Sequence, residues 1–346
     1  MSTLGQEFEC TIEEAAILLE ILTDAGDPVM IHGAPGLGKS DIVRQLGARK
    51  KRKVIDIRLN LREPVDLRGI PMPDVATGTT KWMVPDELPQ AERDGAEGYL
   101  FLDEINTASQ QMMAAAFGLV LDRKVGEYTL VDGWVIIAAG NRVADKASAQ
   151  RMPTALRNRF AHIIVVPDVA AFCTWANVSG VAPELIAFQR LRSGENGGKG
   201  ILHVMPKGDE NAFPTPRSWT KAAKFVGAPK KHRMRLFAAH VGAAYATEFD
   251  AFIDLYHSIG DLQDIIKSPK TARLPADPST RYATCTGLAR MATKATFANV
   301  VEYVKRLNHR ESEALVVHDA TSRDAALKNT TVYGAWAVEN QDLTIQ

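Results

Sequence analysis

The octapeptide GAPGLGKS, from Gly33 to Ser40, constrains this chain more than any other stretch of its sequence. It fits the pattern G-x-x-x-x-G-K-[ST], and it lies between a short apolar run, Val29–Ile31, and a segment with apolar positions at helical spacing. A glycine-rich turn between a strand and a helix lets backbone N–H groups curl around phosphate oxygens, and the helix start adds partial positive charge. The sequence therefore predicts a phosphate cradle on an α/β sheet.

The residues of this cradle have distinct expected roles. The Lys39 ammonium is expected to reach the β- and γ-phosphates of a bound nucleotide, and the Ser40 hydroxyl is expected to ligate Mg²⁺. The predicted cradle consists of Gly33, Ala34, Pro35, Gly36, Leu37, Gly38, Lys39 and Ser40.

Two further apolar runs end in polar residues that suit the same site. In GYLFLDEIN, the predicted strand Tyr99–Leu102 delivers Asp103 and Glu104 at its carboxyl end, which is where open α/β sheets place their ligands. Asp103 is expected on the metal side, and Glu104 is expected to polarise the attacking water. In GWVIIAAGN, a third buried strand ends at Asn141, whose amide could orient that water or contact the γ-phosphate.

The order of apolar runs predicts the architecture. Five strand-like runs alternate with helical stretches up to residue 168, which indicates a five-stranded parallel sheet covered on both faces. We expect this α/β domain over residues 1–168, a helical lid over 169–262 and a C-terminal helical extension over 263–346. Within the lid we expect one long helix from about Lys231 to His257. The five runs are Val29–Ile31, Val54–Ile57, Tyr99–Leu102, Val135–Ala138 and Ile163–Val166.

Composition narrows the possible partners. The 346 residues contain 41 Lys and Arg against 41 Asp and Glu, so no overall charge draws the chain to nucleic acid or an anionic membrane. The basic run from Arg49 to Lys53 is interpreted as the dipole-complementing end of the cradle helix rather than as a nucleic-acid patch. Three dispersed cysteines and no membrane-length apolar run lead us to expect a soluble, cytoplasmic protein with reduced thiols.

Together these motifs resemble the MoxR-type branch of the AAA+ ATPases. The resemblance assigns Gly33–Ser40 to the P-loop, Asp103 and Glu104 to Walker B, and Asn141 to sensor 1. The stretch REPVDLRGIPMPDVATGTTKWMVPDELPQ, residues 62–90, looks like the insert of that branch, and the segment around Gly126 looks like its hairpin before sensor 1. The resemblance implies ATP and Mg²⁺ as cofactors.

Three arginines gain expected roles from this resemblance. Arg159, in the triplet NRF ahead of the fifth strand, matches the family's arginine finger, which reaches the ATP of a neighbouring subunit, and Arg157 is the candidate second contact. Arg217 follows a predicted helix N-cap at Thr215 and matches sensor 2. The alternative for Arg157 and Arg159 is pairing with surface acids, and for Arg217 it is a solvated helix charge.

The leading expectation is a ring-forming ATPase, expected to be hexameric, that remodels a client protein. The resemblance implies a chaperone-like role beside a separate von Willebrand A domain protein, because this chain lacks the D-x-S-x-S metal motif of such a domain. A nucleic-acid motor or loader is the first alternative, and the balanced charge does not favour it. A nucleotide-dependent scaffold is the second alternative, and the presence of Glu104 and Arg159 argues against it.

Overall fold

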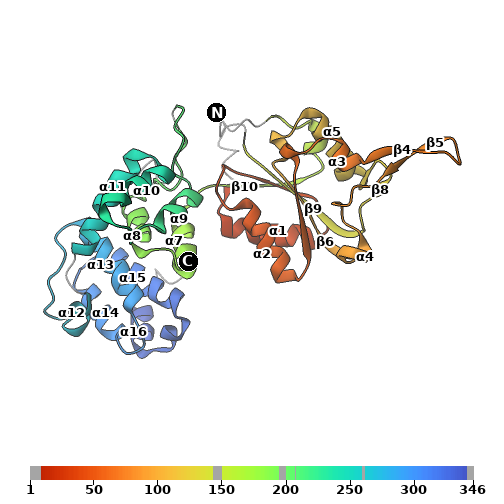
Figure 1. Ribbon diagram of the computed structural model, residues 1–346. Coiled ribbons are helices and arrows are strands. Elements are labelled where there is room, and N and C mark those ends of the chain that lie inside the picture. The colour runs from red at the N-terminus through yellow and green to blue at the C-terminus, as the bar shows by residue number, and fades with distance from the viewer. Residues whose placement is uncertain (1–8, 143–149, 195–199, 207, 259–261, 341–346) are drawn as a thin grey trace. The chain divides into compact units, whose positions relative to one another are not determined.

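The computed structural model describes residues 9–142, 150–194, 200–206, 208–258 and 262–340 (Figure 1). The chain forms two compact units, Met1–Val166 and Pro167–Gln346. The first unit is α/β, and the described part of the second is helical. The division lies next to the expected boundary at residue 168, whereas the further boundary at residue 262 stays a prediction.

The first unit is built on a parallel sheet in the order β1-β10-β2-β9-β6-β3. All five expected strands are present, but the described residues form a sheet of six strands rather than five. The additional strand is only two residues long and pairs with the edge of β10, so no apolar periodicity marks it in the sequence. The strands are β1 (Glu9–Cys10), β2 (Val29–His32), β3 (Lys53–Arg58), β6 (Glu97–Asp103), β9 (Gly133–Gly140) and β10 (Ala161–Val165).

Both faces of this sheet are buried, as expected for parallel strands. Alternate residues of one strand enter opposite cores: Tyr99 and Phe101 of β6 pack with helices α1 and α2, whereas Leu100 and Leu102 pack with α5. The helices of this unit are α1 (Ile12–Asp24), α2 (Lys39–Lys50), α3 (Val65–Arg68), α4 (Ala91–Asp94), α5 (Gln110–Asp122) and α6 (Thr154–Arg157).

Two antiparallel hairpins extend the α/β unit; the first lies in the expected insert of residues 62–90, and the second is the hairpin that the resemblance implied around Gly126. The first pairs β4 (Ile70–Asp74) with β5 (Thr79–Met83) and projects away from the sheet in Figure 1. The second pairs β7 (Lys124–Val125) with β8 (Tyr128–Thr129) around Gly126, whose φ is 58°. The hairpins touch, because the backbone N–H of Trp82 donates to Glu127 Oε1 over 3.3 Å.

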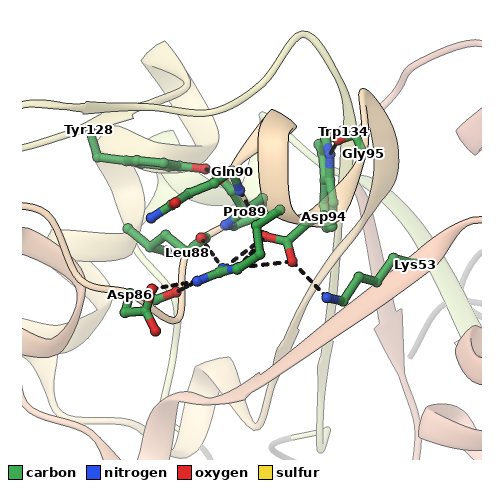
Figure 2. A network of polar contacts seen from close by, with 10 residues as sticks. Lys53, Asp86, Leu88, Pro89, Gln90, Asp94, Gly95, Tyr128 and Trp134 are labelled. Carbon is green, nitrogen blue, oxygen red and sulfur yellow. Dashed lines mark hydrogen bonds and ion pairs between the residues drawn. The ribbon is translucent and has the colours of Figure 1, made fainter.

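A buried carboxylate fastens the chain just before β6 to strand β3 (Figure 2). The Asp94 side chain, 1% exposed, accepts from Lys53 Nζ of β3 at 2.6 Å and from the Arg93 guanidinium. Hydrogen bonding to Arg93 is the main reason why the pKa of Asp94 lies far below its usual range. Nearby, Tyr128 of the second hairpin donates to the Pro89 carbonyl over 2.7 Å. The network thus joins β3 and, through Tyr128, the second hairpin to the chain just before β6.

The second unit is helical in its described part, as expected, but the one long helix predicted for the lid is wrong. The helix expected from about Lys231 to His257 is two helices, because Gly242 takes φ 84° and ends the first of them. Thr215 caps α9 as expected, accepting from the Ser218 backbone N–H at 3.0 Å. The helices are α7 (Val169–Val178), α8 (Pro183–Leu191), α9 (Pro216–Ala223), α10 (Lys230–Val241), α11 (Ala243–Ser258), α12 (Leu262–Lys267), α13 (Pro278–Met291), α14 (Phe297–Lys305), α15 (Arg310–Arg323) and α16 (Thr331–Glu339).

Candidate nucleotide site

The candidate site lies where three adjacent strands end. Strands β2, β9 and β6 are neighbours, and their carboxyl ends lead into Gly33, Asn141 and Glu104 respectively. The carboxyl ends of β2 and β9 lie side by side, because His32 is in register with Gly140 and the Gly33 N–H donates to the Gly140 carbonyl over 3.3 Å. Motifs separated by about a hundred residues in the sequence are thereby brought to one edge of the sheet.

The P-loop has the backbone conformation that a phosphate cradle needs. Gly36 and Gly38 have φ values of 79° and 92°, in the left-handed region that side-chain-bearing residues avoid. Lys39 begins α2, and its buried ammonium donates to the carbonyls of Gly33 at 2.7 Å and Ala34 at 3.0 Å. The lysine charge therefore lies inside the loop, at the helix N-terminus, where a phosphate would be bound.

Ser40 and Asp103 form the pair that would hold Mg²⁺. Ser40 Oγ donates to Asp103 Oδ2 over 3.1 Å, which joins the start of α2 to the end of β6. Burial raises the pKa of Asp103, and the neighbouring charges of Glu104 and Asp56 act in the same direction. A hydroxyl and a carboxylate are the hard oxygen donors that Mg²⁺ prefers. No cluster of three or more His, Cys, Asp or Glu side chains that could hold a metal ion occurs among the described residues.

Glu104 occupies an uncommon backbone conformation. Its φ of 58° and ψ of 32° are left-handed, which costs a residue with a Cβ of the order of 1–2 kcal/mol. The conformation turns the chain immediately after β6, and the Glu104 carboxylate then accepts from Thr107 Oγ1 at 3.1 Å. Such strain collects at functional sites, because the surrounding structure must hold it there.

Asn141 connects the lysine of the cradle to the carboxylate of Glu104. Its side-chain oxygen accepts from Lys39 Nζ at 3.3 Å, and its amide nitrogen donates to Glu104 Oε2 at 3.3 Å. The Asn141 side chain is 6% exposed, so these contacts are shielded from solvent. One amide therefore spans the groups expected to bind phosphate and to activate water.

A second asparagine, which our sequence analysis did not select, fixes this amide. Asn106 Nδ2 donates to the Asn141 carbonyl at 2.5 Å, and the Asn141 N–H donates to Asn106 Oδ1 at 3.1 Å. A Cβ at Gly140 would approach Asn106 Oδ1 within 2.2 Å, so the contact requires glycine there. The only sequence signal is the position of Asn106 just after Asp103 and Glu104, and a turn-forming role accounts for that equally well.

A histidine pair links the P-loop strand to the arginine segment, and it too was missed. His32 precedes the cradle, and its Nε2 lies 2.8 Å from His162 Nδ1; His162 Nε2 lies 2.8 Å from the carbonyl of Arg157. Because a carbonyl only accepts, His162 Nε2 carries a proton; in the uncharged pair, His162 Nδ1 then accepts from His32 Nε2. Burial, followed by the charges of His162, Lys39 and Arg142, lowers the pKa of His32 to about 4.

The structure brings Arg157 into the neighbourhood of this pair. Arg157 ends α6, is exposed, and donates to Thr154 Oγ1 at 3.2 Å. Arg159 is also exposed and, like Arg157, forms no ion pair within the described ranges. A cavity of about 800 Å³, lined partly by Asn141, His162 and Arg157, opens on this side of the unit. Arg217 belongs to α9 of the second unit, so its sensor role stays a prediction.

Comparison with known proteins agrees with this geometry. Residues 28–160 match the family model of the AAA domain, dynein-related subfamily. That segment contains the P-loop, both carboxylates, Asn141, and Arg157 and Arg159. The chain therefore carries an AAA-type ATPase domain on a P-loop α/β fold.

Solved structures with related folds are only distantly similar. A RuvB mutant from Thermotoga maritima is 16% identical over 86% of each chain, with a TM-score of 0.39. NtrX from Brucella abortus in complex with ADP is 15% identical over 96% of this chain and 68% of its own, with a TM-score of 0.36. An inferred ATPase from Cytophaga hutchinsonii is 13% identical over 91% and 82%, with a TM-score of 0.36.

Proposed function

We propose that this chain is a Mg²⁺-dependent ATPase of the MoxR type that assembles into a ring and remodels a partner protein. The AAA domain match and the contacts of Asn141 support it most directly. The Asn141 amide holds the phosphate-binding lysine and the Glu104 carboxylate in one buried arrangement. Attack of water on a γ-phosphate needs a phosphate-binding cation and a base held close together, and this arrangement supplies both.

The side chains divide the work of hydrolysis. Glu104 accepts a proton from the attacking water, and Asn141 keeps that carboxylate oriented. Lys39 and the P-loop N–H groups stabilise charge on the phosphate oxygens. Ser40 and Asp103 would hold Mg²⁺, which when bound neutralises charge on the phosphates.

The exposed arginines support assembly into a ring. Arg157 ends α6 and Arg159 follows it, and neither has an ion pair among the described residues, which leaves both guanidinium groups open to an anion from outside the unit. A neighbouring subunit's ATP is that anion in the proposed ring. An arginine supplied in this way accelerates phosphoryl transfer by about 10³–10⁵ in well-studied nucleotidases.

The projecting β4–β5 hairpin supports a protein as the partner. Its strands and turn expose apolar side chains in excess of what a free surface loop normally carries. The exposed fractions are 61% for Ile70, 50% for Met72, 92% for Val75 and 62% for Met83. A partner with an apolar surface, such as a von Willebrand A domain protein, would cover them, and the chaperone role follows from that contact.

Hydrolysis is tested with two variants. Lys39→Ala should lose nucleotide binding in calorimetry, whereas Glu104→Gln should bind ATP and release phosphate about 10²–10⁴-fold more slowly. Unchanged phosphate release by Glu104→Gln would reject the assigned base.

The ring is tested by mixing subunits. Arg159→Ala and Lys39→Ala chains are each expected to be inactive, and co-assembled rings should regain activity because intact composite sites form between them. Light scattering first establishes that the mixed oligomer forms. If it forms and stays inactive at every ratio, the arginine does not act in trans.

The partner is tested on the hairpin. Proteins retained by ATP-stalled Glu104→Gln are identified and purified, and their affinity is remeasured with Met72→Asp and Val75→Asp added. Loss of binding with unchanged ATP affinity is expected, and Thr79→Asp on the same hairpin serves as the matched control. Equal affinity for all three variants would exclude the hairpin as the docking element.

A further inference from the structure

The formally neutral chain concentrates positive charge in one segment of its helical unit. Between residues 211 and 247, which include α9 and α10, the sequence contains no aspartate or glutamate. The same segment holds seven cationic residues. These are Arg217, Lys221, Lys224, Lys230, Lys231, Arg233 and Arg235. Balanced overall composition therefore conceals a strongly asymmetric local distribution.

Helix α9 presents its cations along one stripe. Arg217, Lys221 and Lys224 follow one another at spacings of four and three residues, so they lie on one helix face, and all three are exposed. The opposite face carries Trp219 and Ala222, which are fully buried in the core of the unit. The stripe thus points away from the core.

Helix α10 separates its cations into two sets. Arg233 is buried and donates to Asp250 Oδ1 at 2.6 Å and to Asp254 Oδ1 at 2.7 Å, and Lys230 pairs with Asp254 at 2.6 Å. These ion pairs fasten α10 to α11. Lys231 and Arg235, one turn apart, lie on the side of α10 away from Arg233 and are exposed.

Acidic residues of the neighbouring helix do not neutralise the exposed set. Asp250 and Asp254 of α11 are engaged by Arg233 and Lys230, and Glu248 pairs with Arg192. Helices α9 and α10 contact one another and share a core (Figure 1). We define the α9–α10 surface by four residues that have no ion pair within the described part of the chain. They are Lys221, Lys224, Lys231 and Arg235.

We propose that the α9–α10 surface binds the phosphate backbone of a nucleic acid. The Lys and Arg side chains are spaced on two packed helices, where they can neutralise successive phosphates. A protein partner fits less well, because protein interfaces are depleted in lysine and need an apolar centre. Among the described residues 211–247, Met234, at 39%, is the one exposed large hydrophobic side chain. The proposal goes beyond the proposed function and does not depend on it.

The test is a salt-dependent binding measurement on the full chain. Fluorescence anisotropy is recorded with labelled duplex DNA, single-stranded DNA and single-stranded RNA of mixed sequence. The variant carries Lys221→Gln, Lys224→Gln, Lys231→Gln and Arg235→Gln; Arg217 is left intact because of its predicted nucleotide role. If all four cations contact phosphates, the slope of log affinity against log salt falls by about 3–4 for duplex DNA. At about 0.1 M salt, affinity is expected to fall tenfold or more.

A control variant separates local from overall charge. Lys267→Gln, Lys270→Gln, Lys294→Gln and Lys328→Gln change the net charge equally and lie on other parts of the same unit, all exposed. This control should keep wild-type affinity and slope. Basal ATP turnover and circular dichroism report whether both variants fold. Should the fourfold variant not fold, the pairs Lys221/Lys224 and Lys231/Arg235 are changed separately, and each should remove about half of the slope change.

Three outcomes would overturn the proposal. The wild type could fail to bind any of the nucleic acids at low salt. The control variant could lose affinity as strongly as the α9–α10 variant, which would reduce the effect to net charge. Poly-glutamate could bind the wild type as tightly as the nucleic acids do, which would identify the surface as a site for acidic protein instead.

Discussion

The histidine pair beside the P-loop makes the stability of the α/β unit depend on pH. Replacing His32 with glutamine removes one titrating group while keeping a side chain that can donate a hydrogen bond to His162 Nδ1. The surroundings of the His32 imidazole disfavour its protonation. Burial, together with the charges of His162, Lys39 and Arg142, lowers its pKa from 6.5 to about 4, so it folds as the neutral imidazole.

The direction and size of the effect follow from that shift. A group whose pKa is lower in the folded state binds fewer protons when folded, so stability is present above pH 6.5 and is lost as pH falls toward 4. The whole shift corresponds to about 3 kcal/mol, and about 2 kcal/mol of it is lost between pH 7 and pH 5. For a unit of this size, about 2 kcal/mol lowers the melting temperature by roughly 4–8 °C.

Calorimetric melting of the full chain at several pH values measures this loss. His32→Gln should lose about 2 kcal/mol less than the wild type between pH 7 and pH 5. His318→Gln, at an exposed position on α15, is the matched control and should follow the wild type. Nuclear magnetic resonance titration of the imidazole signals reports the pKa directly. Parallel losses in wild type and His32→Gln, or a His32 signal titrating near 6.5, would refute the reasoning.

Three other variants address separate parts of the molecule. Asp103→Asn should raise the melting temperature of the nucleotide-free chain in the presence of a chelator. Because the pKa of Asp103 is raised in the folded state, ionising its carboxyl group costs stability as pH rises through that pKa. Equal melting temperatures of variant and wild type at pH 7 would contradict this. Asp319→Ala should destabilise the helical unit by about 3–5 kcal/mol in denaturant unfolding, because it leaves buried Arg190 unpaired, and adding Arg190→Met should restore most of the loss. Gly69→Ala should distort the β4–β5 hairpin, because the new Cβ would lie 2.0 Å from the Met83 carbonyl oxygen. A Cβ at Gly78 meets no neighbour, so Gly78→Ala should cost only the backbone strain of about 1–2 kcal/mol. Hydrogen exchange of the hairpin amides compares the two variants.

The parts of the fold that the sequence predicted are those encoded by local patterns. The glycine spacing in the P-loop, the apolar run before Asp103 and the run before Asn141 each specify a strand end without reference to the rest of the chain. The sequence also predicted that these three motifs meet in one site, since parallel strands place their carboxyl ends at one edge of a sheet. The Thr215 cap was readable for the same local reason.

The missed features depend on contacts between distant residues. Asn106 and Asn141 form their paired hydrogen bonds across 35 positions, and His32 meets His162 across 130. No residue type or spacing marks either pair in one sequence. The break at Gly242 was missed because a glycine within an apolar periodic stretch can also be tolerated inside a helix. The neutral net charge hid the α9–α10 surface, because a sum over the chain contains no information about position.

Strand β6 gives the proposed partner contact a physical connection to the nucleotide site. The Asp94 network holds the chain just before β6 against β3, and Trp134 of β9 donates to the Gly95 carbonyl over 3.0 Å. Strand β6 begins at Glu97 and ends at Asp103, eight residues after Gly95. Strand β6 is hydrogen-bonded on both sides, to β3 and β9. A force that a bound partner exerts on the hairpins would therefore act on the whole sheet. Under the proposed function, partner binding would therefore reach the carboxylates at the end of β6 through the sheet rather than through a loose loop.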